Sequence, residues 1–125
     1  DDQDVNAQLD VTAVALTLDS DGHVTSAVGD MTEPALTVSA DGGVSAPKTV
    51  RSKREQGDEY GMRQASKLGK EWYEHSEGFC DYLKGKTASE IAAIPTDGSN
   101  ADLAALCTIS VDDLQKAAGK ALAER

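Results

Sequence analysis

The first 47 residues of this chain contain no lysine or arginine, and basic residues are scarce overall. The 125 residues carry 12 Lys and Arg against 22 Asp and Glu, a formal net charge of −10. Non-specific affinity for nucleic acids comes mainly from Lys and Arg that neutralise phosphates, so we expect no nucleic-acid partner. The same balance disfavours binding to an anionic membrane surface.

Long hydrophobic runs are also missing. No stretch reaches the roughly 18 apolar residues that a transmembrane helix needs, and the acidic residues 1–4 do not resemble a signal peptide. We therefore expect no direct membrane insertion by this segment. The start is typical of a mature or trimmed terminus, and any anchor would precede it.

Cysteine and histidine are rare, with two of each. Cys80 and Cys107 stand on different predicted elements, so the sequence allows either one disulfide staple or two separate buried thiols. Glu71 and His75 are spaced four apart and could bind a metal from one helical face. No third ligand accompanies them, which favours a surface pair instead. No nucleophile–base pair stands out, and we expect no enzyme activity.

The N-terminal third predicts β-hairpins. Residues 1–10 are polar and are expected to be disordered. From Val11 to Leu18 apolar residues occupy both alternating faces, which favours a central strand. An Asp-Gly turn at 19–22 leads to a returning strand at 23–28, and a similar Asp-Gly unit follows at 37–44. Two hairpins in tandem predict a four-stranded antiparallel β-meander. The Asp-rich first turn lacks the terminal Glu of a calcium loop and indicates an ordinary turn.

The main helix is predicted over about 70–84, and it carries most of the aromatic residues. Trp72, Phe79 and Leu83 fall at helical spacing and would pack on the sheet. Gly78 inside this helix indicates a close approach by another element or a ligand, or a bend. Shorter helices follow at about 88–93 and after Ser110, whereas residues 101–109 are compatible with helix or strand. The predicted fold class is α+β, one domain over residues 11–125: a small antiparallel β-meander packed against an aromatic-bearing helix, with shorter C-terminal helices.

Residues 48–70 reverse the charge of the chain, with seven bases against three acids. A solvated basic loop that complements the acidic strands is one interpretation. A local anion site is the other, because aromatic residues accompany the bases. These aromatics are more typical of a core than of a ligand box. The aromatic residues in question are Tyr60, Trp72, Tyr73, Phe79 and Tyr82.

The segment Asp102-Leu-Ala-Ala-Leu-Cys-Thr108-Ile-Ser resembles the motif of the FMN-binding domain family: Asp, two residues, Ser/Thr, Gly, Ala and Ser/Thr. An Ala-rich terminal helix follows the motif in both. The Leu-Asp-x-Asp-Gly-x-Val hairpin and the helix end Phe-x-x-Tyr-Leu-x-Gly-Lys also match in order. The segments Tyr-Gly-Met at 60–62 and Gly-Lys-Glu-Trp at 69–72 are similar to segments of bacterial lipoproteins.

The resemblance implies an extracytoplasmic domain at the cell surface, or one membrane-anchored through a missing N-terminal segment, that binds FMN or another small ligand and serves electron transfer. In that family the last Ser/Thr, here Thr108, is esterified to the FMN phosphate. Leu106 replaces the family's Gly, which disfavours the covalent link. Arginines would neutralise a phosphate. The predicted cofactor-binding residues are Thr108, Asp102, Arg51, Arg54, Arg63, Tyr60 and Trp72, with Lys48 and Lys53 as further counter-charges. The alternative is a cofactor-free structural or interaction module on the cell surface.

Overall fold

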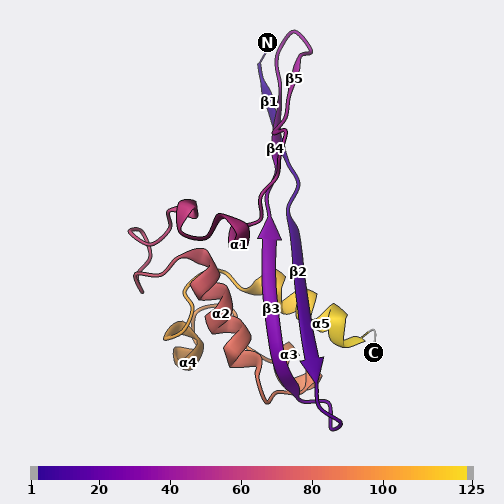
Figure 1. Cartoon of the computed structure of the whole chain (residues 1–125), viewed down its shortest axis with the longest axis vertical. Helices are drawn as coiled ribbons and strands as arrows, with labels where there is room; N and C mark the ends of the chain where they lie inside the picture. The colour runs from indigo at the N-terminus through magenta and orange to yellow at the C-terminus, as the bar shows by residue number, and fades with distance from the viewer. Residues whose placement is uncertain (1–2, 124–125) are drawn as a thin grey trace.

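The computed structural model describes residues 3–123 and has the predicted α+β class, with two small antiparallel sheets and a set of helices (Figure 1). Within these residues, no helix is long and apolar enough to cross a membrane. The strands are β1 (Val5–Gln8), β2 (Val11–Leu18), β3 (Val24–Thr32), β4 (Ala35–Val38) and β5 (Val44–Ser45). The helices are α1 (Lys53–Gln56), the 3-10 turn η1 (Gly57–Tyr60), α2 (Trp72–Leu83), α3 (Ala88–Ala92), α4 (Ala101–Ala104) and α5 (Asp112–Ala123).

The first hairpin forms as predicted, by antiparallel pairing of β2 with β3. Its turn is closed because the Asp19 amide donates to the His23 carbonyl at 2.9 Å, and Gly22 takes the positive φ of 84° that the turn requires. The expected central position of β2 is wrong. β2 belongs to a two-stranded sheet, and its residues alternate between exposed and half-buried because the helices cover only one face.

The strands also pair differently from the predicted four-stranded meander. β4 pairs with β1 and β5, not with β3, so the second sheet has the order β1-β4-β5. The Leu9 amide donates to the Pro34 carbonyl at 2.9 Å, so the pairing of the two chains continues across the junction between the sheets. Residues 5–8, which were expected to be disordered, thus form a strand, while residues 1–2 of that segment lie outside the described part. Figure 1 shows this second sheet extending away from the helices.

Helix α2 lies inside the predicted range and is the centre of the core. At its first turn the Glu71 amide donates to the Glu74 carboxylate at 2.7 Å, and the Glu74 N–H donates to the Glu71 backbone carbonyl at 3.1 Å. Phe79 and Leu83 are fully buried. Both long helices cover the same face of the hairpin, with α2 packed on β3 and α5 on β2. Helix α5 has 12 residues, as many as α2, so only α3 and α4 match the prediction of shorter C-terminal helices.

Gly78 marks a close approach by another part of the chain. A Cβ at this position would lie 2.5 Å from the Leu106 carbonyl oxygen, so the turn after α4 rests directly on α2. Of the two conformations left open for residues 101–109, the structure has a short helix, which is followed by irregular chain.

Cys80 and Cys107 are both buried and unbridged, so of the two alternatives the structure has separate thiols. Burial raises the pKa of the Cys107 thiol to about 11 and raises the pKa of Cys80 as well. Neither thiol is therefore suited to act as a nucleophile near neutral pH.

Candidate functional site

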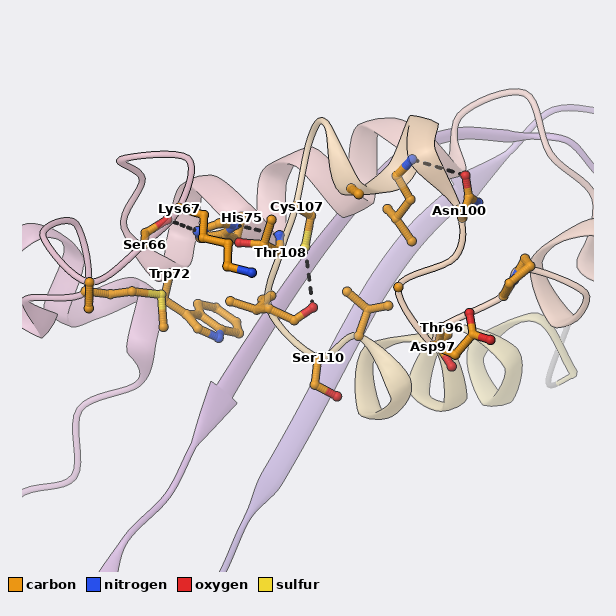
Figure 2. A pocket seen from close by; sticks show the side chains of 18 of the residues that line it. Ser66, Lys67, Trp72, His75, Thr96, Asp97, Asn100, Cys107, Thr108 and Ser110 are labelled. Atoms are coloured by element: carbon orange, nitrogen blue, oxygen red, sulfur yellow. Dashed lines mark hydrogen bonds between the residues drawn. The ribbon is translucent and has the colours of Figure 1, made fainter.

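A groove of about 810 Å³ lies between α2, the loop before it and the chain that connects α4 to α5. Trp72, at the start of α2, and Thr108, in that connection, both line it. Figure 2 shows these two residues at one end of the groove with Lys67, and Thr96 and Asp97 at the other. Two residues predicted from separate segments thus share one site.

The position of Thr108 depends on a hydrogen bond to α2. Its backbone N–H donates to Nδ1 of His75 at 3.1 Å. Thr108 is otherwise exposed and lines the groove. His75 is itself fully buried on the inner face of α2, and its Nε2 lies 2.9 Å from Oγ of Ser66 in the preceding loop. His75 therefore ties both walls of the groove to the helix between them.

This geometry decides the protonation of His75. Because Nδ1 accepts a hydrogen bond, the proton of the neutral ring is on Nε2, which donates to the Ser66 hydroxyl. A ring in this tautomer has no free nitrogen to take a proton from Ser66, so the pair lacks the arrangement of a Ser–His nucleophile. Burial, and then the nearby Lys70 ammonium, lower the pKa of His75 and keep it neutral.

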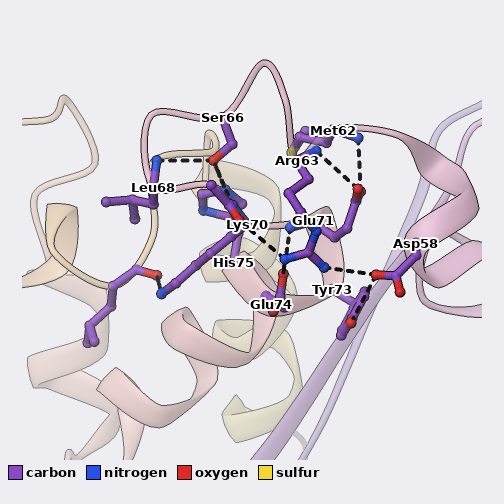
Figure 3. Close-up of polar contacts among 12 residues, drawn as sticks. Asp58, Met62, Arg63, Ser66, Leu68, Lys70, Glu71, Tyr73, Glu74 and His75 are labelled. Atoms are coloured by element: carbon purple, nitrogen blue, oxygen red, sulfur yellow. Dashed lines mark hydrogen bonds and ion pairs between the residues drawn. The ribbon is translucent and has the colours of Figure 1, made fainter.

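The predicted surface pair of Glu71 and His75 is wrong, because both side chains are buried. Glu71 is only 2% exposed, and its two carboxylate oxygens accept from the backbone N–H groups of Met62 at 2.9 Å and Arg63 at 3.0 Å (Figure 3). These bonds fix the loop at 62–69 to the start of α2. Both side chains thus use their polar atoms in hydrogen bonds that hold the fold.

Two lysines bring positive charge to the groove. Lys53 is nearly buried and is neutralised by Glu33, whose carboxylate lies 2.7 Å from its Nζ. Its Nζ also lies 5.3 Å from the centre of the Trp72 ring, a cation–π distance. Lys67, by contrast, is exposed and makes no ion pair with any residue in 3–123. Lys67 is therefore the cation available to an anionic ligand.

The arginines predicted to bind a phosphate lie outside the groove lining. Arg51 pairs with Glu59 at 2.6 Å, and Arg54 lies 3.4 Å from Glu77. Arg63 bridges two acids at the loop surface, Asp58 at 2.9 Å and Glu74 at 3.0 Å (Figure 3). Glu59 and Asp58 lie within eight residues of the arginines that they pair with, whereas Glu74 and Glu77 belong to α2.

Two other predicted site residues are also outside the groove lining. Tyr60 is half-buried, and with Arg51 it lines a smaller cavity of about 260 Å³. Asp102 is exposed on α4. Of the seven predicted residues, the groove brings together Thr108 and Trp72 only. Ser66 and Lys67 were not among the predicted cofactor-binding residues, although Lys67 is one of the seven bases of residues 48–70, because a hydroxyl and a charge in a loop carry no periodic signal.

The turn between β2 and β3 gathers Asp19, Asp21 and His23, whose potential ligand atoms lie within 4.8 Å of one another. One oxygen of Asp19 already accepts from the backbone N–H groups of Asp21 and His23, at 2.9 Å each. These bonds lower the pKa of Asp19 and are those of a turn closed by its aspartate. The prediction of an ordinary turn at residues 19–22 accounts for these hydrogen bonds.

Comparisons with known proteins give one partial likeness. A chlorophenol reductase from Desulfitobacterium hafniense is 45% identical over 40 residues, which are 32% of this chain and 12% of that protein. The match thus spans about an eighth of the relative's length. No protein family matches the chain, and no solved structure does.

Proposed function

We propose that this chain is an extracytoplasmic FMN-binding-like domain of a bacterial lipoprotein, whose groove holds a flavin or a related planar anionic ligand for electron transfer. One observation carries the proposal: Thr108 and Trp72, which the motif and the aromatic cluster pointed to separately, line the same groove. Its volume of about 810 Å³ falls within the range of small-ligand sites.

The groove offers the groups that such a ligand needs. Lys67 supplies a charge for a phosphate, and hydrogen bonds from an ammonium to phosphate are among the stronger polar contacts. The Ser66 hydroxyl accepts from His75, so its own proton is available to an oxygen acceptor. Hydroxyls of Thr108 and Ser110 belong to the same lining. In this account the chain binds and positions a redox group and performs no catalysis of its own.

The replacement of glycine by Leu106 does not close the groove. The side chain of Leu106 is not part of the groove lining, and its carbonyl oxygen accepts from Nζ of Lys70 at 3.0 Å. The backbone of Leu106 lies against Gly78 instead. Thr108 thus stays accessible in the groove, and covalent attachment of the FMN phosphate to its hydroxyl is the strong form of the proposal.

Intact-mass measurement after co-expression with a flavin transferase tests this strong form. The transferase would move an FMN group from an activated flavin nucleotide to the Thr108 hydroxyl, and the other half of the nucleotide would leave with the hydroxyl proton. We expect a mass increase of FMN less one water and visible absorption in the flavin bands. The Thr108→Ala variant loses the adduct, whereas Ser110→Ala, which removes the neighbouring hydroxyl of the groove, keeps it. An unmodified wild-type mass, or an adduct that survives in Thr108→Ala, rejects attachment at this residue.

The alternative, a cofactor-free surface module, is favoured by a different observation. The three arginines expected at a phosphate are engaged in ion pairs outside the groove. The absorption spectrum of the purified protein separates the two functions: flavin bands support the first, and their absence after incubation with FMN and desalting supports the second. The partial likeness to a chlorophenol reductase adds an association with reduction chemistry but assigns no residue.

A further inference from the structure

The sheet β1-β4-β5 has one apolar face and one polar face. Directly paired residues of antiparallel strands lie on the same side of a sheet, and Val5 pairs with Val38 while Ala7 pairs with Leu36. Val38 also pairs with Val44 of β5. One face therefore consists of Val5, Ala7, Leu36, Val38 and Val44. The opposite face consists of Asn6, Gln8, Ala35, Thr37 and Ser45.

Nothing in the described chain covers this apolar face. The sheet extends away from the helices (Figure 1), and no helix packs on its three strands, in contrast to β2 and β3. Val5 is 60% exposed and Val44 is 68% exposed. Large side chains of this kind on one side of a sheet normally lie against a second layer, because an amphipathic sheet gains its stability from burying that side.

The surroundings of the face carry one sign of charge. Residues 1–47 contain no Lys or Arg, and within residues 3–123 the carboxylates of Asp4, Asp10 and Asp41 make no ion pair. Asp10 accepts a hydrogen bond from Gln8 of β1, and Asp4 and Asp41 accept from backbone N–H groups of the β4–β5 turn. The apolar face is thus accompanied by unneutralised acids at both ends of β1 and at the β4–β5 turn.

We propose that this apolar face is a docking surface for a partner protein whose contact area has aliphatic side chains at its centre and Lys or Arg around them. Charge complementarity selects this occupant, since the acids would pair with the basic rim as the aliphatic side chains meet. An anionic membrane would be repelled by the same acids, and two copies of the face would bring like charges together. The inference does not depend on flavin binding in the groove.

The probe is a short synthetic peptide of alternating valine and lysine, titrated into the ¹⁵N-labelled protein and followed by NMR chemical shifts. We expect saturable shifts confined to β1, β4 and β5 that weaken as salt is raised. The same peptide with glutamate in place of lysine should cause none. Shifts centred on the groove or on the basic loop, or equal shifts with both peptides, would overturn the proposal.

Variants on the two faces of β4 test the location. Leu36→Thr/Val38→Thr places β-branched residues, which favour strands, at both positions but makes the apolar face polar, and we expect binding about tenfold weaker. Ala35→Thr places the same residue type on the opposite face of the same strand and should leave binding unchanged. If the double variant disturbs the strand pairing, Val44→Thr at the exposed edge serves the same purpose with a smaller effect.

Two outcomes contradict the proposal directly. Equal weakening by Ala35→Thr would show that the apolar face is not the contact. Concentration-dependent association of the protein alone, with broadening at Val5, Leu36 and Val38 that is relieved in the double variant, would identify a second copy as the occupant.

Discussion

The side chain of His75 holds together the parts of the candidate site. It joins Thr108 to Ser66 through the body of α2, and burial makes this possible by keeping the ring neutral. The sequence showed a histidine four residues after a glutamate and nothing more. Its partners lie in a loop before the helix and 33 residues after it, so local spacing could not reveal that either side chain was buried.

His75 should make stability depend on pH. The folded protein lowers the pKa of this ring, so the unfolded chain binds the proton more readily. The stabilisation is present above the unfolded pKa of about 6.5 and is lost as pH falls below it. Urea unfolding measured between about pH 7.5 and pH 5 should show a falling midpoint.

A variant pair tests the assignment of this slope to His75. Asn at position 75 can offer an oxygen to the Thr108 N–H but cannot titrate, so His75→Asn should flatten the slope while costing about 1–3 kcal/mol. His23→Asn, which replaces the other histidine at a half-exposed turn position, should keep the slope. A slope that persists in His75→Asn would mean that other groups cause it.

At the scale of elements, the sequence predicted which segments form helices and strands better than it predicted which strands pair with one another. The hairpin turn at 19–22 and the range of α2 follow from local signals, namely Asp-Gly and the spacing of Trp72, Phe79 and Leu83. The pairing partner of β4 does not follow from local signals. Pro34 indicates an interruption of the strand but does not indicate whether the chain reverses its direction there. In the structure the chain continues in the same direction from β3 into β4, and β4 pairs with β1.

Two helical glycines should respond in opposite ways to the same substitution. In Gly78→Ala the new methyl group would meet the Leu106 carbonyl at 2.5 Å, so we expect a loss of about 1–3 kcal/mol from overpacking. Gly119 on α5 has no neighbour within 4 Å of a Cβ, so Gly119→Ala should stabilise by up to about 1 kcal/mol.

Chemical unfolding of both variants at one pH measures this difference. Stabilisation by both substitutions would mean that the turn after α4 does not rest on α2. It would also remove the support that places Thr108 in the groove.

The whole molecule divides into a helix-covered hairpin and an uncovered sheet. The buried apolar residues come from β3, the helices and the chain around them, and none comes from β1, β4 or β5. This division explains why a strand pattern with apolar residues on both faces misled the prediction. Val11 and Val28 lie on the uncovered side of the hairpin and are 48% and 45% exposed.

Hydrogen exchange should report this division. Backbone amides of β1, β4 and β5 have little buried surface to protect them, and a small uncovered sheet is marginally stable. We expect them to exchange orders of magnitude faster than amides of α2 and β3, which open only on global unfolding. Equal protection throughout the two sheets would contradict the absence of a covering layer.

The measurement that tests the central claim most directly is a titration of FMN with the purified protein, followed by flavin fluorescence. We predict saturable binding that weakens about tenfold or more in Lys67→Met, from the loss of a charged hydrogen bond. Lys116→Met, which removes an exposed lysine of α5 outside the groove, should leave it unchanged. A flavin signal that does not saturate, or that weakens equally in both variants, would contradict a flavin site in this groove.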